Sequence, residues 1–270
     1  MNTRTSALTF VTGLAFAAML VAAATSHAAV LLDTTTSNFQ STASLTTPVT
    51  VGNNAARMLL IGVSDRDTQN NGSDNRAVTG ITYAGDNISG NFLGQITNAD
   101  AAGRKAYTRL YYVLAPGVGT NHLVVNFSNS TGSQVNVVSL YNVDQSAPSI
   151  FDFVSQDAIT TDLTLNSTSP DAAMVSFATR KSGFTVTPTL TGPTGTVTLG
   201  TWDQGNTEGG FGWTPLSSTG SKTHSWNSGN ATASEWAIGG VIVNPIPEPG
   251  SMALLAAGGL FMVLRGRRSV

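Results

Sequence analysis

Between residues 29 and 243, apolar and polar residues alternate with a period of two in many short runs. Alternation of this kind puts one face of a run against a core and the other in solvent, and it predicts β-strands. No run has a convincing amphipathic helical period, so we expect an all-β antiparallel sandwich, either a jelly roll or an immunoglobulin-like fold. The predicted strands are 58–63, 78–83, 92–97, 106–114, 122–127, 134–141, 162–165, 172–178, 184–190, 196–199, 209–215, 224–226 and 236–243.

The strand-rich segment 29–243 is predicted to be one β-sandwich domain. Its roughly 215 residues are enough to bury a real core, and neither a linker nor a fixed-period repeat is evident in it. The runs Gly80–Gly85, Arg109–Pro116 and His122–Phe127 resemble strands of β-sandwich modules that recur in bacterial secreted proteins. That resemblance implies an architecture and no catalysis.

The N-terminal segment has the composition of a secretory signal peptide. Arg4 precedes an apolar, alanine-rich run from Ala7 to Ala24, and Ser26-His27-Ala28 offers small residues where a signal peptidase cuts. We predict a signal peptide over residues 1–28, cleaved between Ala28 and Ala29. The alternative is a retained signal anchor, and both interpretations predict export.

The C-terminal segment is divided into a proline-rich spacer and a short apolar run. Prolines at 245, 247 and 249 disfavour helix, so residues 244–251 are predicted to be an extended, solvated linker. The uncharged run up to Leu264 would extend about 22 Å as a helix, which is short of the roughly 30 Å hydrocarbon core. We predict a short transmembrane helix and basic tail over 252–270, with the arginines on the cytoplasmic side.

Pro247-Glu248-Pro249, the apolar run and the closing Arg265, Arg267 and Arg268 together resemble the PEP-CTERM sorting signal of Gram-negative bacteria. The resemblance implies that a membrane-embedded exosortase recognises and cleaves the Pro-Glu-Pro region. It also implies a protein that is transiently anchored in the inner membrane, then reaches the cell surface or the exterior, and accompanies exopolysaccharide or biofilm. The alternative interpretation is an ordinary C-terminal membrane helix.

Composition excludes several classes of function. The 270 residues include no cysteine, so disulfides, thiolate nucleophiles and cysteine metal sites do not exist. Only nine of the 13 basic residues, but 14 of the 15 acidic ones, lie between the two terminal segments, which argues against nucleic acid as a partner. The pairs Arg104-Lys105 and Arg180-Lys181 are interpreted as solvated turns.

No residue pattern indicates catalysis, and we expect neither an enzyme nor a cofactor. His122 and His224 each lack a second histidine at metal-ligand spacing, and no Gly-x-Ser-x-Gly elbow occurs. A glycosidase needs two facing carboxyl groups, but Glu208 and Glu235 are the only glutamates of the body and lie far apart in sequence.

The segment from Asp65 to Asp74 is rich in oxygen ligands. Its spacing is not that of an EF-hand, so we interpret it as a solvated loop, with a loop-borne calcium site as the alternative. The candidate calcium ligands are Asp65, Asp67, Asn71 and Asp74.

All four tryptophans of the chain lie late in the body. Exposed aromatic rings stack on sugars, so a lectin-like protein that binds exopolysaccharide is the alternative function. Packing in the core is the interpretation that we favour for these residues, and a non-catalytic surface or matrix protein is the function that we favour. The candidate glycan-binding residues are Trp202, Trp213, Trp226 and Trp236.

Overall fold

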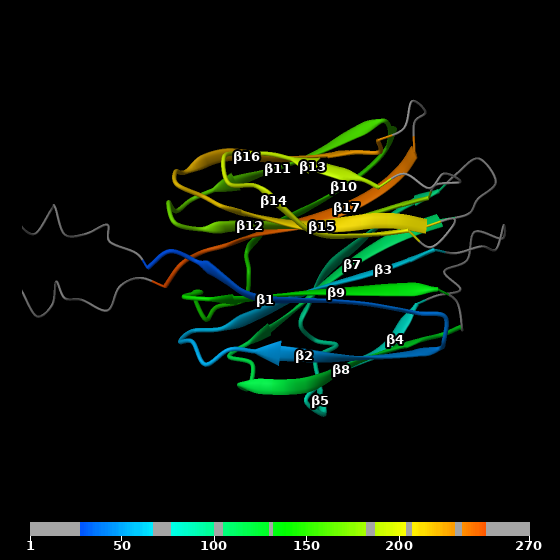
Figure 1. Cartoon of the computed structure of the whole chain (residues 1–270), viewed down its shortest axis with the longest axis horizontal. Helices are drawn as coiled ribbons and strands as arrows, with labels where there is room; N and C mark the ends of the chain where they lie inside the picture. The colour runs from blue at the N-terminus through cyan, green and yellow to red at the C-terminus, as the bar shows by residue number, and fades with distance from the viewer. Residues whose placement is uncertain are drawn as a thin grey trace, which may run out of the picture. The chain divides into compact units, whose positions relative to one another are not determined.

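The computed structural model describes residues 28–66, 77–99, 105–129, 132–181, 187–203, 207–229 and 234–246. Residues Ala29–Ile246 form one compact unit, whose described residues contain strands and no helix (Figure 1). The predicted all-β, antiparallel character is therefore confirmed. The predicted signal peptide up to residue 27 and the predicted C-terminal helix lie outside the described residues. Within the described residues, no helix is long and apolar enough to span a bilayer.

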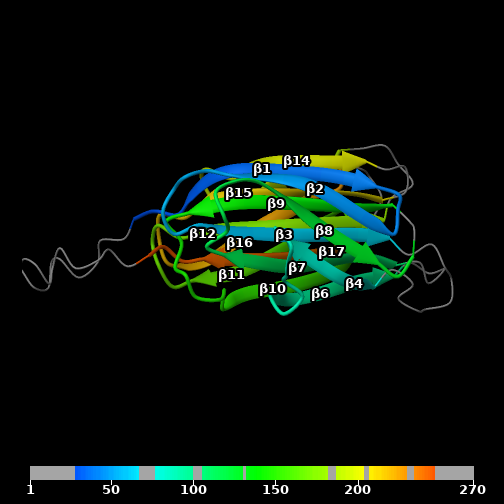
Figure 2. The ribbon, with the colours of Figure 1, turned by 90° about the horizontal axis from the view of Figure 1, so that it is seen from below.

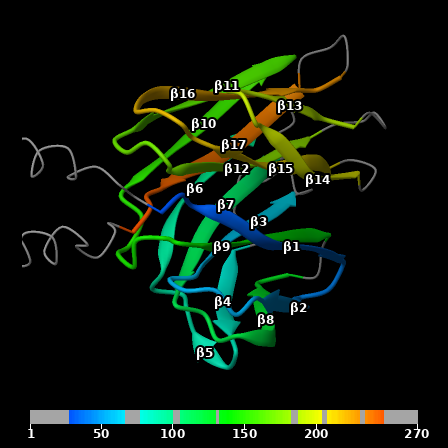
Figure 3. The same ribbon diagram turned by 60° about the vertical axis from the view of Figure 1, so that its left-hand side comes forward.

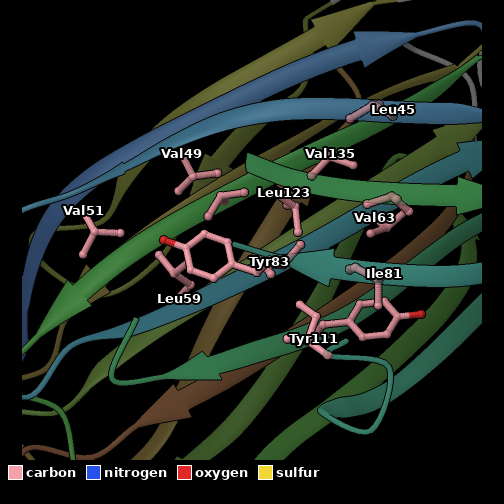
Figure 4. Packing of buried hydrophobic residues seen from close by; sticks show 14 of the residues in the cluster. Leu45, Val49, Val51, Leu59, Val63, Ile81, Tyr83, Tyr111, Leu123 and Val135 are labelled. Carbon is pink, nitrogen blue, oxygen red and sulfur yellow. The ribbon is translucent and has the colours of Figure 1, made fainter. Parts of the chain in front are cut away.

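The first half of the body is a sandwich of two antiparallel sheets. A first inner sheet has the order β1-β9-β3-β7-β6, and a first outer sheet has the order β2-β8-β4-β5. Between them lies an apolar cluster that includes Leu59, Tyr83 and Leu123 (Figure 4). The strands are β1 (Leu31–Gln40), β2 (Ser44–Val51), β3 (Met58–Arg66), β4 (Val78–Tyr83), β5 (Asp86–Asn87), β6 (Phe92–Ala99), β7 (Lys105–Leu114), β8 (Gly119–Phe127) and β9 (Ser133–Tyr141).

The second half forms another sandwich. Its inner sheet has the order β10-β17-β12-β15-β14, and its outer sheet has the order β11-β16-β13. A separate apolar cluster around Trp226, Trp236 and Ile238 fills it. The strands are β10 (Ile150–Ala158), β11 (Thr160–Ser167), β12 (Ala173–Lys181), β13 (Thr189–Thr191), β14 (Val197–Asp203), β15 (Thr207–Pro215), β16 (Gly220–Asn227) and β17 (Ser234–Val243).

The two sandwiches have the same strand order, apart from the short β5, which has no counterpart among the described strands of the second. Individual bonds repeat as well: Ala115 N donates to Arg57 O at 3.0 Å, and Leu216 N donates to Ala172 O at 2.8 Å. These bonds show that β3 corresponds to β12, and β7 to β15, residue by residue. The body is thus an internal duplication, which the absence of a sequence repeat had hidden.

Each sandwich has the connectivity of a jelly roll. The first and last strands of each half pair in the inner sheet, as β1 with β9 and β10 with β17. The second strand pairs with the next-to-last in the outer sheet, as β2 with β8 and β11 with β16. An immunoglobulin sandwich instead pairs its first two strands, so the pairing favours the jelly roll of the two folds expected.

The two inner sheets pack against each other, so the body has four layers of sheet where the sequence suggested two (Figures 1 and 3). A Cβ placed on Gly62 would lie 2.2 Å from the Phe177 ring, so glycine is what lets these two central strands approach. Thr108 Oγ1 donates to Ala237 O at 2.7 Å and lies 2.7 Å from Thr179 Oγ1. The two sandwiches therefore share a third apolar core, which lies between their inner sheets.

Most predicted strands coincide with observed ones. The predicted strand 184–190 lies outside the described residues up to 186, and the observed strand there, β13, begins at Thr189. The strands that the sequence reading missed, β1, β2, β5 and β10, lie at sheet edges. β1, β2 and β10 each pair with a single neighbour inside a sheet. Pro48 lies within β2, where an edge position tolerates the missing backbone donor, and β1 has a register shift between Leu32 and Thr34. β1 and β10 have no buried residue and so lack a clear signal. β2 alternates exposed and buried residues throughout, but Pro48 and the buried Thr47 disguise that pattern in the sequence.

Candidate functional site

The junction between the body and the C-terminal tail is part of the fold. Val143 and Pro245 form an isolated antiparallel bridge, and Pro245 is buried. Ile246 N donates to Asn142 O at 3.0 Å, and Asp144 N donates to Asn244 O at 2.9 Å. Sequence reading placed a solvated spacer from residue 244, whereas residues 244–246 still pair with the body, up to the last described residue, Ile246.

The N-terminal end of the body also contacts Asn142, the residue that bonds to Ile246. Asn142 Nδ2 donates to Ala29 O at 3.1 Å, and Val30 N donates to Asp171 O at 2.8 Å. Asn142 thus holds the first residue expected after signal cleavage and the last residue before the Pro-Glu-Pro sequence. Sequence reading did not single it out, although an asparagine between a strand and a turn often adopts a left-handed backbone, as Asn142 does with φ 59°.

Both chain ends therefore leave the body at one end of the sheets, which we call the junction end. β3, β12 and β14 end at the opposite end of the sheets (Figure 2). The sorting residues themselves lie outside the described residues. They are Pro247, Glu248, Pro249, Arg265, Arg267 and Arg268.

Each sandwich contains a buried ion pair near the end opposite to the junction. Arg109 pairs with Asp65 in the first sandwich, and both side chains are at most 2% exposed. Arg180 pairs with Glu208 in the second, and both are fully buried. Asp65 and Arg180 occupy equivalent places, opposite Tyr107 and Glu208 on the neighbouring strand.

The ion pairs correct two predictions about charged residues. Arg180 was expected in a solvated turn, but it lies in β12 with its guanidinium 5.4 Å from the centre of the Trp236 ring. Asp65 was expected in a loop, with calcium binding as the alternative, but it is buried in β3 and its carboxylate contacts Arg109. A charged residue gives no apolar signal in the sequence, so the predicted strands in β3 and β12 stopped before Asp65 and Arg180.

The remaining calcium candidates, Asp67, Asn71 and Asp74, lie outside the described residues. Among the residues that the structure does describe, no three histidine, aspartate or glutamate side chains are grouped closely enough to hold a metal ion. Glu208 is fully buried against Arg180, so it does not reach a substrate as a glycosidase carboxylate would have to. Glu235 is partly exposed on β17.

His224 is a buried titratable group in the core of the second sandwich. Its side chain is fully buried, with Nδ1 2.7 Å from Ser176 Oγ and Nε2 2.7 Å from Thr214 Oγ1. Trp226 Nε1 donates to the same Ser176 Oγ at 3.0 Å. Burial lowers the pKa of His224 from 6.5 to about 4, so the imidazole is neutral and acts as a link in a polar network of the core.

His224 should make the protein less stable in mild acid. Because its pKa is lower in the folded than in the unfolded chain, stability falls as pH drops below 6.5, by about 1.4 kcal/mol per pH unit until pH 4. Urea unfolding at pH 7.5 and 5.0 should reveal a loss of about 2 kcal/mol, which His224→Gln removes. His122→Gln, at an exposed strand position, should leave the loss intact; an equal loss in all three proteins would contradict the assignment.

The tryptophans do not form the sugar-binding surface that was considered for them. Trp226 and Trp236 are fully buried, and Trp202 is 8% exposed, so no open ring face is left for stacking. Trp213 is half-buried and packs against the cluster between the two inner sheets. Trp202, Trp226 and Trp236 thus lie in the core, and Trp213 lies at its margin.

His122, in contrast, lies where the sequence placed it, as an exposed residue of β8 opposite Pro48. His122 and His224 thus occupy a surface position and a core position.

Comparison with known proteins separates the tail from the body. No curated protein and no solved structure matches the chain significantly. Residues 245–268 match the family model of the PEP-CTERM protein-sorting motif. The match begins at Pro245, the last buried residue among those described, and it covers the Pro-Glu-Pro sequence, the apolar run and the three arginines. This chain therefore carries a PEP-CTERM sorting motif at the junction end of its body.

Proposed function

We propose that this protein is a non-catalytic surface or matrix protein, which an exosortase releases from the inner membrane by cutting at Pro247-Glu248-Pro249. The PEP-CTERM motif implies processing by an exosortase and delivery to the cell surface. The observation that carries the proposal is the direct connection of this motif to the folded body at Pro245 and Ile246. The stacked sandwiches would then be the part that remains outside, in contact with exopolysaccharide.

The geometry of the junction supports the release of an intact body by cleavage at the tail. Asn142 bonds both to Ala29 and to Ile246, so the two predicted processing sites flank one end of the body. A body held at that end would direct the opposite end of its sheets away from the membrane. Cleavage at the tail would leave the paired segment Asn244–Ile246 in place, so the fold should survive processing.

Mass spectrometry of the protein recovered from the cell exterior tests the proposal. The expected mature chain begins at Ala29 and ends within or next to Pro247-Glu248-Pro249, and it lacks Met252–Val270. A chain that still ends at Val270 outside the cell would contradict processing. A mature C-terminus far inside the body, before Asn142, would contradict the release of an intact fold.

A further inference from the structure

The first sandwich has a cavity of about 400 Å³ on its open side. It lies where the edge strand β6 of the inner sheet faces β4, which on this side pairs with β5 only through Thr82 and Tyr83. The lining includes Thr79, Ser89, Phe92, Gln95, Arg109 and Tyr111. Its volume is at the lower end of the range of about 300–1,000 Å³ that is usual for small-ligand sites.

One side of the cavity is aromatic. The rings of Phe92 and Tyr111 lie 5.0 Å apart between centroids and are tilted by 43°. Phe92 is 44% exposed, which is unusual for a phenylalanine and leaves part of its ring open, while Tyr111 is 6% exposed. The view of the core in Figure 4 shows the Tyr111 hydroxyl directed away from Tyr83. An open ring next to a buried one offers an apolar surface for stacking.

The other side is polar and is held rigidly. Arg109 is 2% exposed, pairs with Asp65, and lies with its guanidinium carbon 4.6 Å from the centre of the Tyr107 ring. Its Nε donates to Gln95 Oε1 at 3.1 Å. This bond fixes the Gln95 amide so that its Nε2 donors are directed away from the guanidinium. The groups that a ligand would meet are thus preorganised.

The ion pair between Arg109 and Asp65 determines which ligand charge the cavity favours. The guanidinium of Arg109 is neutralised by Asp65 inside the wall of the cavity, so the site offers no excess positive charge to a phosphate or carboxylate. Burial also raises the pKa of Tyr111 above its ordinary value of 10.0, which keeps the phenol as a neutral donor. Amide, hydroxyl and ring surfaces without net charge suit a neutral ligand with many hydroxyl groups and one apolar face.

The duplication provides an internal comparison. In the second sandwich, Gly210 and Gly212 occupy the places of Arg109 and Tyr111, as the pairing with β12 and β3 shows. A Cβ on Gly210 would lie 2.6 Å from the Trp226 ring, and one on Gly212 would lie 2.0 Å from Leu190. The second sandwich thus fills with core side chains the space that the first leaves open. The cavity is therefore a property of the residues of the first copy and not of the fold.

We propose that this cavity binds a neutral sugar unit of a glycan, with its ring against Phe92 and its hydroxyl groups on Gln95, Tyr111 and Ser89. The site differs from the late tryptophans, and it does not depend on the processing of the tail. A sugar ring has the required combination of an apolar face and a hydroxylated edge.

Binding to immobilised neutral gluco-, galacto- and manno-oligosaccharides tests the site, with uronic-acid oligosaccharides as a second arm. The protein should bind at least one neutral oligosaccharide, and Phe92→Ala should weaken that binding about tenfold through the lost ring contact. Thr79→Trp, which fills the cavity from an exposed strand position, should abolish it. Phe151→Ala, at another exposed phenylalanine, should leave it unchanged.

Each other result overturns the proposal. Absence of binding to every neutral oligosaccharide, or binding to uronic-acid oligosaccharides alone, would refute the ligand class. Neutral binding that survives both Phe92→Ala and Thr79→Trp, or that Phe151→Ala weakens equally, would place the binding surface elsewhere. Thermal melting curves of the variants establish that each one is folded before its binding is compared.

Discussion

Replacing Pro247, Glu248 and Pro249 by alanine is expected to stop processing, so that full-length protein ending at Val270 accumulates in the inner membrane. The motif at residues 245–268 is what an exosortase would recognise, and three alanines remove both the extended backbone that proline imposes and the single carboxylate. Cell fractionation followed by mass measurement should give a shift from almost complete release to almost none.

The matched control is an alanine triplet at Ser217, Ser218 and Thr219, in the exposed turn between β15 and β16. It changes three polar residues without touching the junction, and the variant should be released like the wild type. Normal release of the 247–249 variant would exclude these residues as the recognition site. Equal retention of both variants would point to a folding or export defect instead.

Glu208→Ala is expected to cost about 3–5 kcal/mol of folding stability, the largest effect that we predict for a single body residue. Glu208 and Arg180 are both fully buried, so removal of the carboxylate leaves a guanidinium charge in the core next to Trp236. Urea unfolding followed by tryptophan fluorescence would measure the change in the free energy of unfolding. The partly exposed Glu235 is the control, and Glu235→Ala should change stability by less than about 1 kcal/mol.

The double variant Arg180→Met/Glu208→Met tests whether the loss comes from the stranded charge. An apolar pair of similar volume needs no desolvation of ions, so the double variant should regain most of the stability that Glu208→Ala loses. If the double variant is as unstable as the single one, the pair stabilises the core by its geometry and not only by mutual neutralisation. A Glu208→Ala variant as stable as the wild type would show that Arg180 finds water or another partner.

Short runs dense in apolar residues were sufficient to predict the central strands, because an inner sheet that is covered on both faces buries almost every side chain of such a strand. β3, β7, β9 and β12 are of this kind, and each was located to within a few residues. The edge strands β1 and β10 escaped detection because neither has a buried residue, so neither carries an apolar run or a regular alternation. Arg180 and Asp65 were misplaced for a related reason: the period-two pattern treats a charge as a solvent signal, although an ion partner from a neighbouring strand permits burial.

The sequence by itself determined the all-β class and the sorting motif, because both depend on residues that are close together along the chain. Tertiary structure alone decided the four-layer stack of two duplicated jelly rolls, the burial of the tryptophans, and the meeting of Ala29 and Ile246 at Asn142. It also decided that Tyr111 lines a cavity while its counterpart Gly212 lies under Leu190. These features depend on which strands pair and which faces pack, and residues more than a hundred positions apart leave no common local pattern from which to read them.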